Sequence, residues 1–213
     1  MIRTYIESQG IYKFVQKLFG NTNRSAYRYT ENILSKYQDL IEYKYLHNSS
    51  RRLNQIQTKK SISLVKGLKL GASINEVRKQ FSVSPYVNSY KSKGLKRTIL
   101  LYKIKYGGQK VKIEAHFYKN QLFFSKYIFS KVSETEQGGL VNLFGKKYGL
   151  QDLGFENKNI IDASHHCVKI NTGTELSINY IQLENPFFEK MQSKMAIVPN
   201  EIDFNYGVNL GVQ

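Results

Sequence analysis

The first hydrophobic pattern in the chain has helical spacing and covers residues 2–46. Apolar residues from Ile2 to Phe19 form a loose stripe that ends at a polar turn beginning with Gly20. From Ser25, which can cap a helix, apolar side chains recur every three or four residues as far as Tyr45, with charged residues between them. This spacing predicts a pair of helices, and the polar, basic stretch 47–60 predicts the linker that follows.

Two short motifs predict helices later in the chain. Ser73 and Glu76 fit a capping box, in which the hydroxyl accepts from a backbone N–H three residues on and the carboxylate reaches back. Ser133 and Glu136 repeat the motif. We therefore expect helices from Ser73 to about Phe81 and from residue 133 to about 148.

Between these two helices the pattern changes to the alternation of strands. Segments 97–106 and 110–119 place apolar residues on one face and lysines on the other, and Gly107-Gly108 between them predicts a tight hairpin. Asn120-Gln121 predicts a second turn into 122–130, whose register is ambiguous because both faces are apolar. Segments 160–170 and 175–183 are further strand candidates. Together they predict an antiparallel meander with one basic, partly solvated face.

These elements predict an α+β fold, in which an N-terminal helical pair is followed by an antiparallel meander sheet with helices packed on one face. We expect a helical hairpin and basic linker in 1–60, the meander domain in 61–183 and a C-terminal tail in 184–213. The tail has one short helical segment, 187–195, and then no periodicity. At 213 residues the chain is long enough to bury about 70% of the surface exposed by the unfolded chain.

Charge is divided unevenly along the chain. Residues 1–150 carry 28 Lys and Arg against 8 Asp and Glu, or +20, and residues 151–213 carry 4 against 8, or −4, which sum to +16. Such a field attracts nucleic acid, an anionic surface or an acidic protein. Only 7 of the 32 basic residues are Arg, the residue suited to bidentate phosphate contacts, so the charge favours loose attraction. An AT-rich genome would also enrich Lys, which leaves a compositional origin open.

The predicted outward face of the meander is the main candidate for a binding site. Its residues are Lys103, Lys105, Lys110 and Lys112 with the aromatic Tyr118, and Lys126 is a further candidate. Basic and aromatic side chains together are typical of nucleic-acid platforms, whereas a solvated lysine face that discourages edge pairing is the simpler interpretation. Arg51 and Arg52 of the linker are the other candidates for contact with a polyanion.

Catalytic and metal-binding signatures are weak. In His165-His166-Cys167 a strand would place at most two ligands on one face, fewer than the four of a structural zinc site, and no orienting group for a Cys-His nucleophile is evident. We expect no cofactor and no enzyme, and one cysteine excludes an intramolecular disulfide. Without a signal-peptide pattern or a stretch of about 20 apolar residues, we expect a cytoplasmic protein or one acting in an assembly made inside the cell.

One segment carries a family resemblance. Leu70-Gly71-Ala72-Ser73-Ile74-Asn75-Glu76-Val77, followed by a loop and consecutive strands, resembles the helix entry of the SmpA/OmlA lipoprotein family, whose domain has the β-lactamase-inhibitor-protein-like fold. Leu143-Phe144-Gly145-Lys146-Lys147-Tyr148-Gly149 is similar to the end of a helix in a second helix-then-strand unit. The resemblance covers residues 67–183 and implies a non-enzymatic module that binds other proteins.

Two main functional hypotheses result. The first is a non-catalytic protein-interaction or structural assembly protein, whose partners are other protein subunits or copies of itself. The alternative is a nucleic-acid or polyanion-binding protein that uses the lysine-rich sheet face, and an enzyme with no recognisable motif is a third class. The acidic segment after residue 151 complements the basic body, which predicts salt-sensitive self-association.

Overall fold

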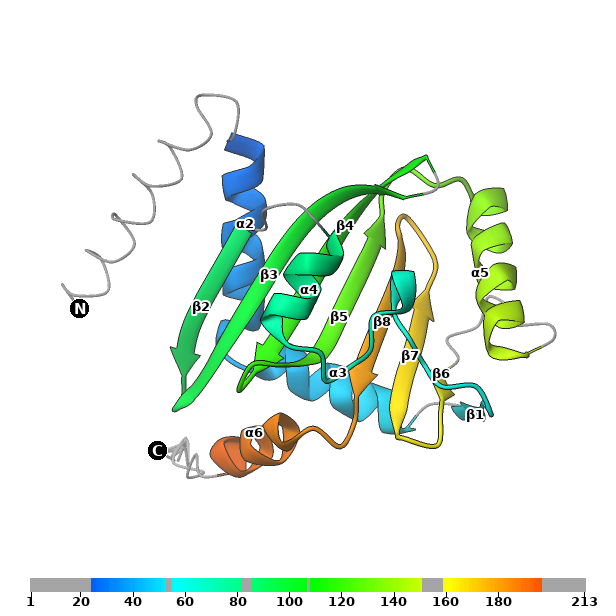
Figure 1. The fold of residues 1–213 in the computed structure, drawn as a ribbon. Helices are drawn as coiled ribbons and strands as arrows, with labels where there is room; N and C mark the ends of the chain where they lie inside the picture. The colour runs from blue at the N-terminus through cyan, green and yellow to red at the C-terminus, as the bar shows by residue number, and fades with distance from the viewer. Residues whose placement is uncertain (1–23, 53–54, 82–85, 107, 151–158, 197–213) are drawn as a thin grey trace, which may run out of the picture.

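An eight-stranded sheet forms the centre of the molecule (Figure 1). The structure is a computed structural model that describes residues 24–52, 55–81, 86–106, 108–150 and 159–196. The strands are β1 Gln55–Gln57, β2 Tyr86–Ser92, β3 Leu95–Tyr106, β4 Gln109–Tyr118, β5 Gln121–Phe129, β6 Asn159–Ile161, β7 His166–Asn171 and β8 Leu176–Gln182. Their order is β1-β6-β7-β8-β5-β4-β3-β2, and only β1 and β6 pair in parallel. The predicted α+β fold is confirmed.

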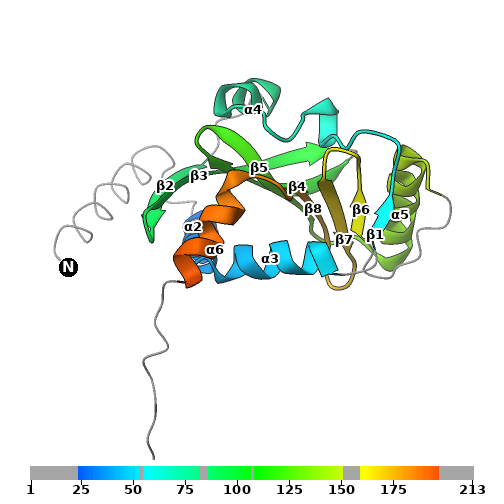
Figure 2. The same cartoon turned by 90° about the horizontal axis from the view of Figure 1, so that it is seen from below.

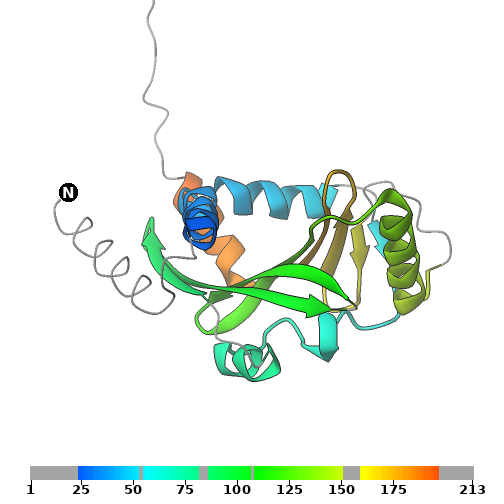
Figure 3. The ribbon, with the colours of Figure 1, turned by 90° about the horizontal axis from the view of Figure 1, so that it is seen from above.

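Helices pack on both faces of this sheet, whereas the sequence pattern predicted them on one (Figures 2 and 3). The helices are α2 Arg24–Gln38, α3 Ile41–Arg52, the short 3-10 helix η2 Val65–Gly67, α4 Ile74–Phe81, α5 Glu134–Tyr148 and α6 Pro186–Ala196. We call the sheet face under α2, α3 and α6 the α3 face, and the opposite one the α4 face. Strand β5 is buried on both faces along most of its length, which explains its doubly apolar sequence.

The boundary between helices at the start of the described chain differs from the predicted one. The segment that was expected to form one helix from Ser25 to Tyr45 is broken at Leu40, whose φ of 73° lies in the left-handed region. The backbone N–H of Ile41 then donates to Asp39 Oδ1 at 3.1 Å, so a new helix begins. Helix α3 continues to Arg52, into the expected linker, and β1 extends the sheet beside β6. The first predicted segment, 2–19, lies outside the described residues.

Both capping boxes are confirmed. The backbone N–H of Ser73 donates to Glu76 Oε2 at 2.7 Å, and that of Glu76 donates to Ser73 Oγ at 3.3 Å. Ser133 and Glu136 make the same reciprocal pair at the start of α5. Helix α5 ends at Gly149, where a φ of 72° lets the chain leave the helix in the left-handed conformation.

The meander contains one more hairpin than the sequence pattern predicted. Strands β2 and β3 are joined by Lys93 and Gly94, with φ of 48° and 79°, so both turn residues are left-handed. Between β4 and β5 the turn residues are Lys119 and Asn120, one position before the predicted pair. A register shift follows in β5, which lets Phe123 and Phe124 both pack into the core of the α3 face.

The strand expected over 160–170 is two strands, β6 and β7, separated by a turn. Asp162 forms this turn, because its Oδ1 accepts from the backbone N–H groups of Ser164 and His166 at 2.9 and 3.0 Å. Its other carboxylate oxygen accepts from the N–H of Ile62 at 2.7 Å. The same side chain therefore ends a strand and fixes a segment 100 residues away in sequence.

The segment expected to be a tail, 184–213, begins with part of the core. In α6 the side chains of Phe187, Phe188 and Met191 are at most 1% exposed. Phe187 packs on Phe123 with ring centroids 4.3 Å apart and on Tyr43 at 5.0 Å. Residues 184–196 thus belong to the layer of helices on the α3 face (Figure 2).

Candidate functional site

The lysines of the meander lie on the α3 face, in rows that the strand register fixes. Lys105 is opposite Lys110 and Lys103 is opposite Lys112 in the ladder of β3 and β4. One row further along, the cross-strand neighbours are Leu101, Glu114, Lys126, Asn179 and Lys169. Because side chains directly opposite each other lie about 4.5–5.5 Å apart at Cβ, positive charge is concentrated on this part of the sheet.

Exposure separates these lysines into two groups. Lys103, Lys105 and Lys110 are exposed, and Lys112 and Lys126 are partly exposed. We call these five residues the lysine face. Lys169 in β7 is 8% exposed, and its Nζ donates to Ser49 Oγ of α3 at 3.3 Å, so it is held at the side of this surface.

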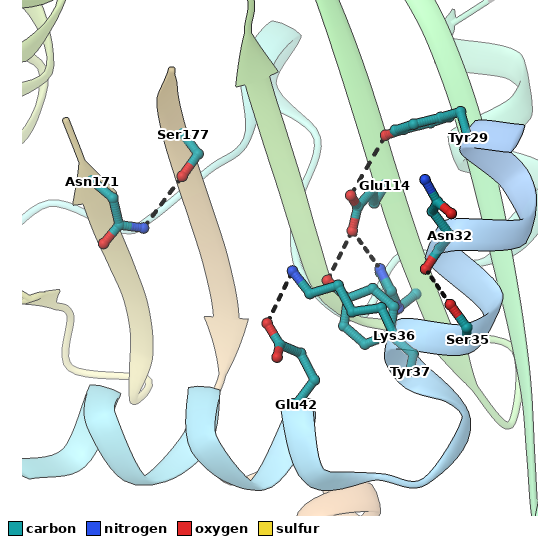
Figure 4. Close-up of polar contacts among 10 residues, drawn as sticks. Tyr29, Asn32, Ser35, Lys36, Tyr37, Glu42, Glu114, Asn171 and Ser177 are labelled. Carbon is teal, nitrogen blue, oxygen red and sulfur yellow. Dashed lines mark hydrogen bonds and ion pairs between the residues drawn. The ribbon is translucent and has the colours of Figure 1, made fainter. Parts of the chain in front are cut away.

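Helix α2 provides one wall of the lysine face. The ring of Tyr29 lies between two lysines, with Lys112 Nζ 5.0 Å and Lys103 Nζ 5.9 Å from its centroid. Such contacts stabilise a cation over an aromatic face. Lys36 of α2 pairs with Glu42 of α3 at 2.9 Å where the two helices meet (Figure 4). The surface therefore has mixed charge at its border and positive charge at its centre.

A buried polar cluster lies beneath α2 and α3 (Figure 4), and its central residue is in the row of the sheet next to the facing pair Lys103 and Lys112. Its centre is Glu114, 1% exposed, whose Oε2 accepts from the hydroxyl of Tyr37 at 2.8 Å. Tyr29 Oη donates to the other carboxylate oxygen at 3.5 Å, and His116 Nε2 lies 3.4 Å from Oε2. The hydroxyl of Tyr43 is 2.7 Å from His116 Nδ1. We call Glu114, His116, Tyr37 and Tyr43 the buried cluster.

The protonation states in the buried cluster follow from these contacts. Burial alone raises the pKa of Glu114, but His116, Lys126 and the Tyr37 hydroxyl outweigh it and lower the pKa overall. Burial lowers the pKa of His116, and the neighbouring Glu114 only partly offsets this. A neutral imidazole with its proton on Nε2 satisfies both contacts, because it donates to Glu114 and accepts from Tyr43. Burial and the nearby Glu114 also raise the pKa of Tyr37 well above its usual range.

This cluster combines a carboxylate, an imidazole and phenols, which are groups used in acid–base chemistry. Glu114, His116, Tyr37 and Tyr43 are each at most 1% exposed. Their hydrogen bonds connect two helices to the central strand β4. The geometry is therefore that of a structural network that attaches α2 and α3 to the sheet.

The structure brings four of the predicted site residues together and separates the others. Lys103, Lys105, Lys110 and Lys112 share one surface. Tyr118 is on the same side of β4 but only 8% exposed, because its ring packs on that of Phe187 with centroids 5.6 Å apart. The prediction that Tyr118 is an exposed aromatic of the binding face is therefore wrong. Arg51 is exposed in the last turn of α3, and the side chain of Arg52 lies outside the described residues.

Three groups near the lysine face had no clear signal in the sequence. Lys36 and Glu42 come from helices whose position over the sheet is a tertiary property. Lys169 belongs to a segment that was predicted to be a strand, but its place in the same row as Lys126 depends on β8 lying between β5 and β7. His116, expected on the outward face, is buried because α2 and α3 cover that part of the strand.

The His165-His166-Cys167 run does not form one face of a strand. His165 is in the turn, with a φ of 55°, and its Nδ1 lies 2.7 Å from Glu184 Oε1. Cys167 is buried, and burial raises the pKa of its thiol to about 12. Within the described residues, no group of three or more His, Cys, Asp or Glu side chains is arranged to hold a metal ion.

Comparison with known proteins does not assign the chain to a family. No family model, curated protein or solved structure matches the chain. Within the described residues, no helix is sufficiently long and apolar to span a membrane. The resemblance of residues 67–183 to the SmpA/OmlA family stays a prediction, and function is argued below from the surface itself.

Proposed function

We propose that the chain is a non-catalytic protein-interaction protein that binds an acidic segment of a partner protein on the lysine face. The main support is the arrangement of Lys103, Lys105, Lys110, Lys112 and Lys126 on three neighbouring strands. Backbone hydrogen bonds hold these strands in place, so the charges are presented on a rigid support. A partner then meets a surface that needs little reorganisation on binding.

The border of the lysine face favours a protein over a nucleic acid. Carboxylates of Glu42 and Glu175 lie near the lysines and limit the extent of the positive surface, which suits a short acidic segment better than a continuous phosphate backbone. Tyr118 is buried and Tyr29 is half-buried under two lysines, so neither ring offers a free stacking platform for bases. Ile41 and Tyr45, one turn apart on α3, are 59% and 68% exposed and suit contact with apolar side chains.

Capture from extracts of the source organism, with and without nuclease, tests the proposal. The face variant replaces Lys103, Lys105, Lys110 and Lys112 with Gln. The control variant makes the same change in net charge at four exposed positions elsewhere, Lys59, Lys91, Lys190 and Lys194. We expect nuclease-resistant protein partners that bind wild type and the control variant but not the face variant. Equal loss with both variants would mean that net charge alone, and no particular surface, attracts the partners.

The second candidate is a nucleic-acid or polyanion-binding protein, which the row of facing lysine pairs favours. Phosphate neutralisation releases counterions, so loss of four contacts should reduce the salt slope by about 2.8 on single strands and about 3.6 on duplex. Fluorescence anisotropy with labelled oligonucleotides over a salt series measures this slope. We expect weak, sequence-indifferent binding at physiological salt, and tight, sequence-selective binding would place this candidate first.

Self-association is the third form of interaction to be tested. A deletion that tests the C-terminal segment must begin after residue 196, because residues 185–196 include a core helix whose removal would disturb the fold. Deletion of residues 197–213 leaves every described contact in place. Sedimentation velocity at low and high salt on the full chain and on this deletion shows whether the end of the chain contributes.

A further inference from the structure

A second surface feature lies on the α4 face, away from the lysine face, between α5 and the segment that contains η2. It is a groove with a volume of about 330 Å³. Its lining residues are Ser63, Leu64, Val65, Gly67, Phe129, Leu140, Leu143, Phe144 and Lys147. Most of them are apolar, and Leu143 is 62% exposed, so the groove presents apolar surface to solvent.

The walls of the groove are fixed by hydrogen bonds. The backbone N–H of Leu64 donates to the carbonyl of Leu68 at 2.7 Å, which closes the loop around η2. The carbonyl of Ser63 accepts from Tyr148 Oη at 3.2 Å and from Lys147 Nζ at 2.6 Å. One wall is therefore attached directly to α5, and the groove is formed before any ligand arrives, as is usual for small-molecule sites.

Lys147 is the charged residue in the lining of the groove. One of its three donors is used by the Ser63 carbonyl. None of the ion pairs between described residues includes Lys147, so no described carboxylate neutralises it. Lys147 is exposed to solvent, and partial desolvation lowers the pKa of its ammonium. A carboxylate ligand would supply a counter-charge that none of the described residues provides.

We infer that this groove is a binding site for a small apolar monocarboxylate. The alkyl part would lie against Leu140, Leu143 and Phe144, and the carboxylate would accept from Lys147. The volume is at the lower end of the range of about 300–1,000 Å³ for small-molecule sites, which suits a short aliphatic acid. This inference is independent of the function proposed for the lysine face, because the two surfaces share no residue.

Octanoate and octanol are the probes, because they share an alkyl chain and differ in the carboxylate. We expect octanoate to bind the full chain with a dissociation constant below about 1 mM, measured by calorimetry, and to shift the backbone amide resonances of α5 and of residues 63–67. Lys147→Met should weaken octanoate at least tenfold and octanol less than twofold, because Tyr148 Oη still holds the Ser63 wall. The matched control Lys146→Met, one residue away and outside the groove, should change octanoate less than twofold.

Leu143→Gln tests the apolar part of the site, and because Leu143 is exposed the fold should be retained. We expect both octanoate and octanol to bind this variant several-fold more weakly. Circular dichroism confirms folding of each variant. Absence of saturable octanoate binding at millimolar concentration, or equal effects of Lys147→Met and Lys146→Met, would overturn the inference.

Discussion

Glu114 attaches α2 to the sheet through two hydrogen bonds. Its carboxylate is 1% exposed and accepts hydrogen bonds from Tyr37 and Tyr29, both on α2. A buried charge is tolerated only when it is paired and hydrogen-bonded, and removal of one partner leaves the others unsatisfied.

We therefore expect Glu114→Ala to lower the free energy of unfolding by about 1–3 kcal/mol for each buried donor that loses its acceptor, which are the Tyr37 hydroxyl and the His116 imidazole. Urea denaturation followed by circular dichroism measures the change. Glu31→Ala is the control, because Glu31 is an exposed carboxylate on α2, the helix that Glu114 contacts, and its loss should cost less than about 0.5 kcal/mol. Similar effects of both substitutions would mean that the buried cluster contributes little to stability.

His116 makes stability depend on pH. It is buried among Glu114, Arg97 and Lys36, and burial keeps its pKa below the ordinary value, so the folded state binds fewer protons than the unfolded chain. Stability is then fully present above about pH 6.5 and falls as pH drops below it, with a slope of up to about 1.4 kcal/mol per pH unit for each such histidine. His47, whose pKa is also lowered by burial, adds to the slope.

Urea titrations between pH 5 and 7.5 measure this dependence. We expect His116→Gln to remove about half of the slope, because His47 retains its share. A second loss of stability belongs to Glu114, whose lowered pKa places it below about pH 4.3. A wild-type slope in His116→Gln would contradict the account of the buried cluster.

At the scale of elements, the turn of the β2–β3 hairpin has a non-glycine residue, Lys93, in the left-handed backbone region, and its replacement can change stability. Lys93 has a φ of 48° and precedes Gly94, and in such two-residue turns Asn-Gly is the favoured pair. We expect Lys93→Asn to raise the free energy of unfolding by about 0.5–1 kcal/mol and Lys93→Val to lower it, because a β-branched residue is strained at positive φ. The urea midpoints of the two variants measure this, and equal midpoints would show that the turn does not limit stability.

Helix α6 provides the second prediction at this scale. Phe187, Phe188 and Met191 are buried against α3 and β5, so truncation after Glu184 should unfold the chain, whereas truncation after Ala196 should leave thermal unfolding cooperative. Removal of one large buried side chain already costs about 3–5 kcal/mol, which is a large part of the stability of a domain. A folded product truncated after Glu184 would show that α6 is dispensable.

Local chemistry explains which elements were predictable. The capping boxes at Ser73 and Ser133 and the hairpin of β3 and β4 depend on neighbouring residues, and all are confirmed, the hairpin by the pairing of Tyr106 with Gln109. The turn between β6 and β7 did have a local signal in Asp162, which accepts from the nearby N–H groups of Ser164 and His166, whereas its contact with Ile62 depends on a residue distant in sequence. The β2–β3 hairpin did carry a signal in Lys93-Gly94, but the alternation of the short strand before it is weak.

At the scale of the molecule, sequence alternation identified which side chains share a face but not which parts of the face are covered. Lys103, Lys105, Lys110 and Lys112 are on one surface as expected, while His116 and Tyr118 of the same face are buried under α2, α3 and α6. The covering depends on where helices from both ends of the described chain pack on the sheet. The position of the lysine face is therefore a tertiary property.

The central claim, that the lysine face is the contact surface for a protein partner, is tested most directly by lysine footprinting of the free chain and of the nuclease-treated complex. Acetylation read by mass spectrometry reports each lysine separately. We expect Lys103, Lys105, Lys110 and Lys112 to become protected in the complex, while the exposed Lys59, Lys190 and Lys194 stay as reactive as in the free chain. Unchanged reactivity of the lysine face in a complex that still holds its partner would contradict the account.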